Sequence, residues 1–323
     1  MAANPKAVFN EVPSTRADQA PADFCAFSNI CEADIIAARL AEQRVFATID
    51  RLGLQRHAWE LDTKGWTVIE PDKVGPPEFI RKLRDKVIEV NERTHGVTAD
   101  VDKGLSDPTR LMSFGEGISV EGILYEGEVI EQAVANEAAL ALIDYLLGES
   151  CLISSVGGII KSQGTQHLEM HVDAVGQPSP LPQVPGVANA TWMLTDYSRE
   201  NGATCFVDGS HHLCRPPTPA EAVDLSLFKA VEAPAGSILV WGANTWHGGV
   251  PRLNPGLRIG LLCFYSRWYM YKGEADPALR ITPEMIARNP PRFRRLSGTD
   301  RMIQHPDGTD TPTTGRIAAS RFA

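Results

Sequence analysis

The sequence has no long apolar run and no CxxC pair, and its N-terminus shows no basic start followed by an apolar block. A membrane-spanning helix needs about 18 or more consecutive apolar residues, so none is expected here. A secretory signal would need the basic-then-apolar pattern, and none is visible. The six cysteines are scattered along 323 residues, which indicates reduced thiols in a cytoplasmic protein.

Positive charge is also scarce. The chain carries 31 Lys and Arg residues against 40 Asp and Glu residues, which gives a formal net charge of -9. A protein with this charge is a poor candidate for binding nucleic-acid phosphates, and the charge argues against a polyanionic substrate. We therefore expect a small-molecule substrate and neither a nucleic acid nor a membrane as partner, with a homodimer possible.

The first half of the chain reads mainly as helix. Residues 1–28 are polar and contain prolines, which predicts an irregular arm. Apolar residues recur at helical spacing over 32–54 and again over 76–94, where a pair of prolines marks the start. A further helix is expected over 131–148, and GWTVIE (65–70) is expected to be a strand.

From about residue 151 the residue pattern changes. Short runs rich in β-formers, such as ATCFVDGSHH and RIGLLCFYSRWYM, are separated by Gly, Pro, Asn and Asp, which is typical of a β-sandwich or barrel. Helices first and strands second, without βαβ alternation, favour an α+β fold with N-terminal helices packed on a jelly roll. We expect one domain over 29–270, helical to about 150, followed by an extension over 271–323 with a short helix (TPEMIARN) and a flexible tail.

The segment HLEMH (167–171) permits two interpretations. On a helix, His167 and His171 would share a face, as in zinc hydrolases. The zinc pattern, however, places Glu directly after the first histidine, whereas here Leu168 stands there and Glu169 follows. On a strand, side chains two apart point the same way, so His171 would share a face with Asp173. The displaced glutamate favours the strand, and His167 is then not expected to be a ligand.

A second histidine completes a metal-binding set if the segment is a strand. His247 follows 76 residues after His171, just past the apolar run 238–241. Two histidines and Asp173 would occupy one face of an octahedral metal and leave three adjacent positions open. This arrangement suits non-haem Fe(II) with a cosubstrate and O2 bound side by side. Because HxD alone occurs by chance, the hypothesis needs support from elsewhere in the chain.

Arg258 supplies that support. It lies 11 residues after His247 at the start of LRIGLLCFYSRW, where alternation puts it on a face with Gly260 and Leu262. An arginine on an apolar face needs an anion, and a guanidinium binds a carboxylate through two hydrogen bonds. A snorkelling arginine, or one paired with an Asp, would give the same pattern by itself. Together with HxD and the distal histidine, the arginine indicates a carboxylate cosubstrate.

These segments resemble the phytanoyl-CoA dioxygenase family of Fe(II)- and 2-oxoglutarate-dependent oxygenases. The resemblance rests on HVD (171–173), ENGATCFVDGSHH (200–212), APAGSILVWGANTWHGG (233–249) and Arg258. GWTVIE and the helix after it resemble the opening of that family. The segments occur in the family's order, and the resemblance covers roughly residues 65–269.

The resemblance implies a double-stranded β-helix, the family's form of jelly roll, in which His171, Asp173 and His247 hold the iron as the catalytic centre. Such enzymes couple the decarboxylation of 2-oxoglutarate by O2 to the oxidation of an unactivated C–H bond. The product is an alcohol or, with a different fate of the radical, a desaturated, rearranged or epoxidised molecule. Related halogenases carry a small residue at the position of Asp173, so the carboxylate here argues for oxygenation.

Cosubstrate contacts are implied by the same resemblance. Arg258 would bind the distal carboxylate of 2-oxoglutarate, Thr204 would touch the cosubstrate through its hydroxyl, and Trp192 would line the pocket. The glutamine that relatives carry shortly before HxD has no clear match, because Glu169 stands there. Relatives can also carry Ser or Thr two residues after the distal histidine, where this chain has Gly249. Because Gly249 has no hydroxyl, cosubstrate binding is expected to depend more on Thr204 and Arg258.

The substrate is weakly constrained by the sequence. We expect a small, largely apolar natural-product or lipid-like molecule of secondary metabolism, with an acyl-CoA or an amino-acid derivative as the alternative. The proline-rich loop 174–189 is expected to act as a lid. A non-enzymatic jelly-roll protein with a vestigial or structural metal is the alternative from another class, although the complete ligand set and Arg258 count against it.

Overall fold

The computed structural model describes residues 32–110, 118–165, 167–174, 177–270 and 280–299, together with two short strands beyond them. The irregular arm expected over residues 1–28 lies outside these residues, as does most of the tail expected at the C-terminus. Within the described residues, no helix combines the length and the apolar character that crossing a membrane requires.

The helices confirm most of the sequence pattern. They are α1 (Glu32–Leu52), α2 (Gln55–Thr63), α3 (Pro77–His95), α4 (Glu128–Val134), α5 (Glu137–Leu147), α6 (Pro219–Ala222), α7 (Pro283–Arg288) and α8 (Pro291–Ser297). Helices α1, α3 and α7 were expected, and α3 buries the predicted stripe that includes Leu83 and Val87. Helices α2, α6 and α8 were not anticipated.

The single helix expected over 131–148 is instead two helices, α4 and α5. Asn136 separates them with an extended backbone, φ -60° and ψ 126°. Its side chain accepts a hydrogen bond from the backbone N–H of Ala139 at 3.1 Å. This is the N-cap arrangement, which satisfies a free N–H group of the first turn and so starts a new helix.

Two antiparallel sheets form the second half of the fold. The large sheet contains, in spatial order, β1 (Trp66–Ile69), β10 (Ile238–Gly242), β7 (Val187–Met193), β12 (Leu257–Ser266), β5 (Leu152–Ser162) and β4 (Ile118–Glu121). The small sheet contains β6 (Leu168–His171), β11 (His247–Gly249), β8 (Thr204–Phe206) and β9 (Lys229–Ala230). Two hairpins lie apart from them, β2 (Ala99–Asp100) with β3 (Gly104–Leu105) and β13 (Ile303–Gln304) with β14 (Asp310–Thr311). Helices combined with antiparallel sheets confirm the α+β class.

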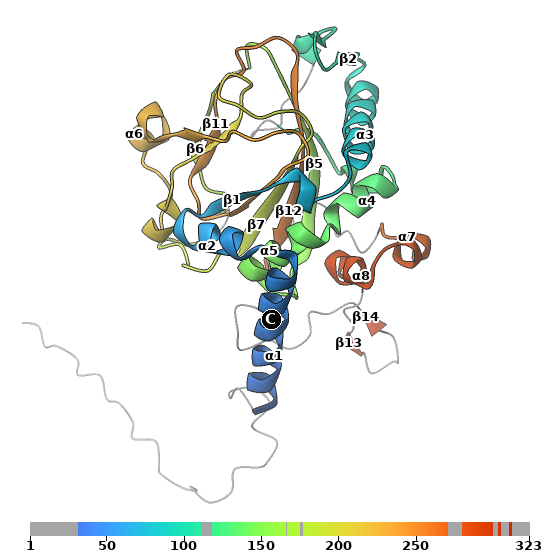
Figure 1. Ribbon diagram of the computed structural model, residues 1–323, viewed down its shortest axis with the longest axis vertical. Coiled ribbons are helices and arrows are strands. Elements are labelled where there is room, and N and C mark those ends of the chain that lie inside the picture. The colour runs from blue at the N-terminus through green and yellow to red at the C-terminus, as the bar shows by residue number, and fades with distance from the viewer. Residues whose placement is uncertain are drawn as a thin grey trace, which may run out of the picture.

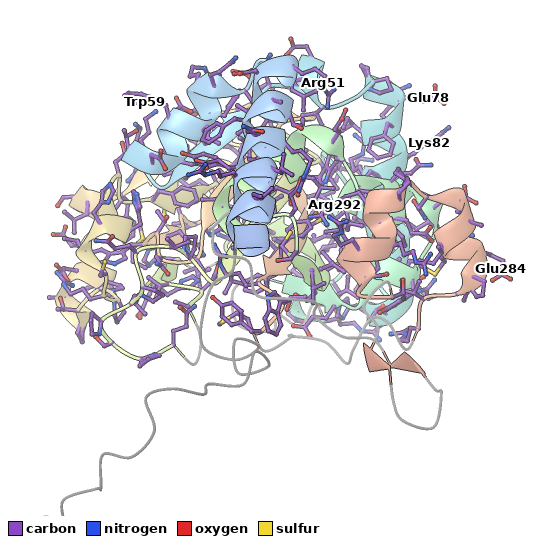
Figure 2. All side chains as sticks on the ribbon, turned by 90° about the horizontal axis from the view of Figure 1, so that it is seen from below. Arg51, Trp59, Glu78, Lys82, Glu284 and Arg292 are labelled. Atoms are coloured by element: carbon purple, nitrogen blue, oxygen red, sulfur yellow. The ribbon has the colours of Figure 1, made fainter. Side chains whose placement is uncertain are left out.

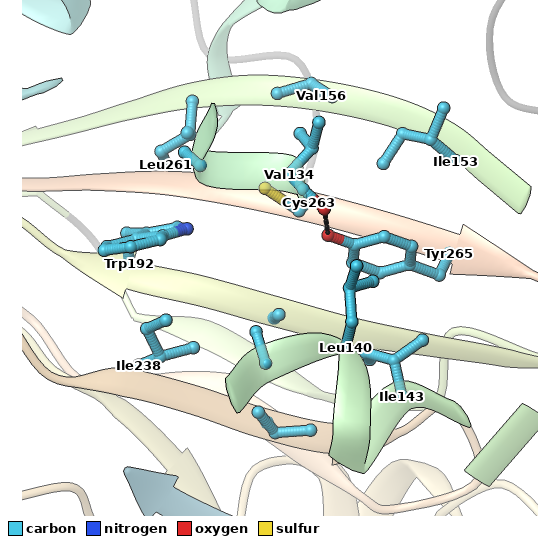
Figure 3. Packing of buried hydrophobic residues seen from close by; sticks show 14 of the residues in the cluster. Val134, Leu140, Ile143, Ile153, Val156, Trp192, Ile238, Leu261, Cys263 and Tyr265 are labelled. Atoms are coloured by element: carbon cyan, nitrogen blue, oxygen red, sulfur yellow. Dashed lines mark hydrogen bonds between the residues drawn. The ribbon is translucent and has the colours of Figure 1, made fainter. Parts of the chain in front are cut away.

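The large sheet is buried on both faces. Helices α3 and α4 lie on one side of β5 and β12, and strands β6 and β11 lie on the other (Figure 1). On β12, Leu261, Cys263 and Tyr265 face the main core beside the helices, where the Tyr265 hydroxyl donates to the Val134 carbonyl oxygen at 2.8 Å (Figure 3). Leu262 belongs instead to the cluster between the sheets, with partners Trp66, Ile159, Met193, Tyr197, Phe206 and Trp241. The face toward the small sheet is therefore the one that can carry a site.

Helices α7 and α8 pack on the domain and add to its main core. Met285, Phe293 and Leu296 are buried in that core. Arg292 of α8 forms an ion pair with Asp144 of α5 at 2.5 Å. Figure 2 shows Arg292 on the side of α8 that faces the rest of the protein, whereas Glu284 projects outward from α7. Part of the C-terminal extension thus completes the cover over the large sheet.

The contribution of α8 can be measured by unfolding. Phe293→Ala should lower the free energy of unfolding by about 3–5 kcal/mol, because it deletes a buried ring and leaves a cavity. Arg294→Ala, at an exposed position of the same helix, should change it by less than about 0.5 kcal/mol. Urea titration followed by tryptophan fluorescence gives both values. Equal effects of the two substitutions would show that α8 is not part of the core.

Candidate metal centre

The two histidines meet because their strands pair. Strands β6 and β11 are antiparallel neighbours, and His171 lies directly opposite His247 in their register. Directly opposed residues point to the same face of a sheet, and the two imidazole ring centroids are 4.3 Å apart. Because the segment from Leu168 to His171 is a strand, the structure contradicts the helical zinc-hydrolase interpretation of HLEMH.

Asp173 joins the histidines from just beyond the end of β6. Its backbone N–H donates to the carbonyl oxygen of Ala243 at 2.9 Å, which ties it to the turn before β11. The carboxylate oxygens lie 3.6 Å from His171 Nε2 and 3.3 Å from His247 Nε2. The three ligand atoms lie within 4.8 Å of one another, and in the described part of the chain no other group of three or more His, Cys, Asp or Glu residues could hold a metal ion.

The tautomers of both histidines suit metal binding. Nδ1 of His171 lies 2.9 Å from the Glu169 carbonyl oxygen, and Nδ1 of His247 lies 3.0 Å from the Thr245 carbonyl oxygen. A carbonyl can only accept, so each Nδ1 carries a proton, and each Nε2 is the ring nitrogen that lies toward Asp173 and can bind a metal. Backbone carbonyls fix metal-binding histidines in this way. The residues present therefore fit a metal ion.

The charges of the ligands also suit a metal ion. Burial raises the pKa of Asp173, but the two histidines and the Asn189 amide outweigh it and hold that pKa below its usual value. Burial, and then the neighbouring His247, lowers the pKa of His171. At neutral pH the site therefore offers a carboxylate and a neutral imidazole, the forms that bind metals. Asn189, which donates to Asp173 Oδ2 at 2.6 Å, was not identified from the sequence.

Arg258 is buried on the face of β12 that turns toward the small sheet. Its side chain is 5% exposed, its Nη1 donates to the Tyr197 hydroxyl at 3.0 Å, and the guanidinium lies 4.9 Å from the centre of that ring. Gly260 leaves space for this contact, because a β-carbon there would lie 2.7 Å from the Tyr197 oxygen. Among the described residues no carboxylate forms an ion pair with Arg258. The alternative of an arginine paired with an Asp is therefore not supported within those residues. A buried guanidinium without a counter-ion fits a site for an anionic ligand.

Thr204 lies on the same face of the small sheet as the metal centre. It pairs directly with Gly249 across β8 and β11. Alternation puts it on the face of Phe206, whose ring lies 5.9 Å from that of His247. The structure thus brings Thr204 to the inner face, and its contact with a cosubstrate stays a prediction. His167 lies outside the metal cluster and stacks on Phe228 with ring centroids 5.3 Å apart.

The structure does not bring Trp192 to this site. Its side chain is fully buried in the main core, where its ring lies 5.4 Å from that of Phe79 in α3. Figure 3 shows it beside Ile238 and Leu261. Successive strand residues point to opposite faces, and its neighbour Met193 belongs to the cluster between the sheets. The expectation that Trp192 lines the cosubstrate pocket is corrected accordingly, since its ring packs against the helices.

The loop expected over 174–189 lies against the turn that precedes His247. The side chain of Asn244 in that turn donates to the Pro182 carbonyl oxygen. Leu181 N–H donates to the Cys214 carbonyl oxygen at 2.7 Å. The last three residues of the expected loop belong to strand β7. Its role as a lid stays a prediction.

Two histidines on adjacent strands and a carboxylate just beyond one of them, with a buried arginine on the facing sheet that has no acidic partner among the described residues, define a mononuclear non-haem metal enzyme. The sequence profile of the phytanoyl-CoA dioxygenase (PhyH) family matches residues 62–260. The chain belongs to that family, which confirms the resemblance drawn from the motifs. It is a non-haem oxygenase that uses iron, 2-oxoglutarate and O2, and the non-enzymatic alternative is not supported.

Relatives with known sequences or structures agree with this membership. Dioxygenase af480 of Aspergillus fumigatus is 34% identical over 116 residues, which is 35% of this chain and 37% of that protein. HygX of Streptomyces hygroscopicus, solved with nickel and 2-oxoglutarate bound, matches with a TM-score of 0.53 and 17% identity over 73% of this chain and 94% of its own. The carbocyclase SnoK of nogalamycin biosynthesis matches with a TM-score of 0.50 and 17% identity over 71% of this chain and 91% of its own. The two structural likenesses show a shared fold.

Metal binding tests the triad directly. His171→Ala, Asp173→Ala and His247→Ala should each weaken Mn(II) binding by more than about 100-fold, because loss of residues that merely support the ligands already costs about 10- to 100-fold. Titration followed by electron paramagnetic resonance measures the affinity. His167→Ala is the matched control and should bind like the wild type. Retained affinity in any of the three variants would remove that residue from the ligand set.

Proposed function

We propose that this enzyme oxidises a small, largely apolar natural-product or lipid-like substrate, by hydroxylation or a related C–H oxidation, at Fe(II) held by His171, Asp173 and His247. The observation that carries the proposal is the triad, in which Asp173 and His247 are buried and His171 is partly exposed, next to a sheet face with a buried Arg258 that has no acidic partner among the described residues. The triad accounts for the iron, and the arginine accounts for a cosubstrate that ends in a carboxylate. We also infer that the two sheets close as the jelly roll of this family.

The iron, with 2-oxoglutarate and O2, supplies the oxidising chemistry, because decarboxylation of the keto acid to succinate provides electrons for O2 activation. The protein supplies position. His171 and His247 present Nε2 because carbonyl oxygens hold their Nδ1 protons, and Asn189 fixes the orientation of the Asp173 carboxylate. Arg258 binds the distal carboxylate of the keto acid, with its guanidinium oriented by Tyr197.

The surroundings of the histidines support an apolar substrate. The rings of Phe206 and Trp241 lie 5.9 Å and 5.2 Å from that of His247, and both belong to the apolar cluster between the sheets. Such walls exclude water, which strengthens electrostatic interactions inside the site. An acyl-CoA or amino-acid derivative is the alternative substrate class. The free thiols at the four described cysteines support a reducing, cytoplasmic location, and a homodimer is compatible with the proposal.

Turnover without a known substrate tests the reaction class. Anaerobic protein given Fe(II) and 2-oxoglutarate should develop the weak visible absorption of a metal-chelated keto acid, and O2 should then release succinate slowly. A true substrate should accelerate this and gain oxygen or lose two hydrogens. In the presence of chloride it should not be chlorinated, because Asp173 occupies the position that a halide would need. Absence of both the absorption and the succinate would refute the proposal, and a chlorinated product would refute the argument from Asp173.

Kinetics of 2-oxoglutarate use test Arg258. Arg258→Ala should raise the KM for 2-oxoglutarate on the order of 100-fold or more, because removing one partner of a buried ion pair costs about 3–5 kcal/mol. Thr204→Val should raise it less, on the order of 10-fold, as expected for one hydrogen bond to a charged group. Arg199→Ala, at an exposed position, serves as the control and should leave the KM unchanged. The assignment of Arg258 fails if its variant keeps the wild-type KM.

A further inference from the structure

A second buried cation lies beside Arg258. Lys161 of β5 is directly opposite Arg258 in the register with β12, and each side chain is 5% exposed. Ile159, two residues before Lys161 on the same strand face, belongs to the cluster between the sheets, so the lysine also faces the small sheet. Like charges directly opposite each other destabilise a sheet. No acidic side chain among the described residues pairs with either cation.

The ammonium group stands next to Gly249. A β-carbon at position 249 would lie 3.0 Å from Lys161 Nζ. Gly249 is two residues past His247, the position where relatives can carry the hydroxyl of Ser or Thr. The lysine nitrogen therefore lies next to the space that such a side chain would fill. Nζ donates to the Val250 carbonyl oxygen at 2.7 Å, which uses one of its three donors and leaves two for a ligand.

The surroundings of Lys161 disfavour its charge until an anion arrives. Burial, and then Arg258 on β12, lowers the pKa of Lys161 to about 7. The other titratable groups that interact electrostatically with Lys161 are Cys205 on β8 and His167 before β6. Burial raises the pKa of the Cys205 thiol to about 12, so this neighbour contributes no negative charge at neutral pH. A carboxylate placed between Lys161 and Arg258 would relieve the repulsion between the two cations.

We propose that Lys161 acts with Arg258 to bind the distal carboxylate of 2-oxoglutarate, in the place that a hydroxyl at position 249 would otherwise take. Lys161 then helps to determine the preference of the enzyme for a keto diacid over a keto acid with an uncharged end. The inference rests on the proposed function, because it assumes that the keto acid binds at the triad with its far end toward Arg258.

Two keto acids of equal chain length separate a binding role from a structural one. Air-free calorimetry on the Mn(II)-loaded protein measures the dissociation constants of 2-oxoglutarate and of 2-oxopentanoate, which has a methyl group in place of the distal carboxylate. In Lys161→Met, binding of 2-oxoglutarate should weaken by about 10- to 100-fold, the worth of a hydrogen bond to a charged group. Binding of 2-oxopentanoate should not weaken, since its far end carries no charge that Lys161 could pair with.

Two further variants complete the test. Lys161→Arg should keep most of the preference for 2-oxoglutarate, because a guanidinium also binds carboxylates. Lys161→Gln keeps a donor for the Val250 carbonyl and loses the charge, so it should reduce the preference as Lys161→Met does. It replaces the Met variant if that protein does not fold. Equal weakening of both keto acids, or an unchanged preference in both uncharged variants, overturns the role of Lys161. A wild-type protein without preference for 2-oxoglutarate overturns the proposed function itself.

Discussion

The register between β6 and β11 is the constraint on which the metal centre depends. It sets His171 directly opposite His247, and the backbone bond from Asp173 to Ala243 then brings the carboxylate to both rings. Side chains alternate between faces with a period of two, so a slip of one residue would turn His247 away from its partners. A three-ligand site is thereby assembled from residues far apart in the chain.

Between the two sheets, the carboxylate of Asp173 has favourable polar partners, whereas the basic side chains of Arg258 and Lys161 have no acidic partner among the described residues. Asp173 has two histidines and the Asn189 amide around it. Arg258 and Lys161 face each other across paired strands, and within the described residues their polar contacts are the Tyr197 hydroxyl and the Val250 carbonyl oxygen. Neutral contacts do not offset the buried charge of Arg258, or that of Lys161 when it is protonated. The interior therefore favours a ligand that brings a carboxylate, which links the fold to the choice of cosubstrate.

The sequence predicted the triad and Arg258 because period-two alternation and metal-ligand chemistry are local signals. The same rule applied to IIKSQ would have found Lys161, a cation on the inner face of an apolar strand. The prediction that Trp192 lines the cosubstrate pocket was wrong because every residue of β7 is buried. In such a strand the pattern of hydrophobic residues does not indicate which sheet face a given side chain is on. The break at Asn136 was missed because an asparagine can also lie on the polar face of a continuous helix, and the extended backbone that marks it as an N-cap is seen only in the structure.

The most direct test of this account is a crystal structure of the Mn(II) complex with 2-oxoglutarate, grown without oxygen. The account predicts the metal on Nε2 of His171, Nε2 of His247 and the Asp173 carboxylate, with the far carboxylate of 2-oxoglutarate in contact with both Arg258 and Lys161. A metal bound elsewhere, or a keto acid whose far carboxylate touches neither cation, would contradict it.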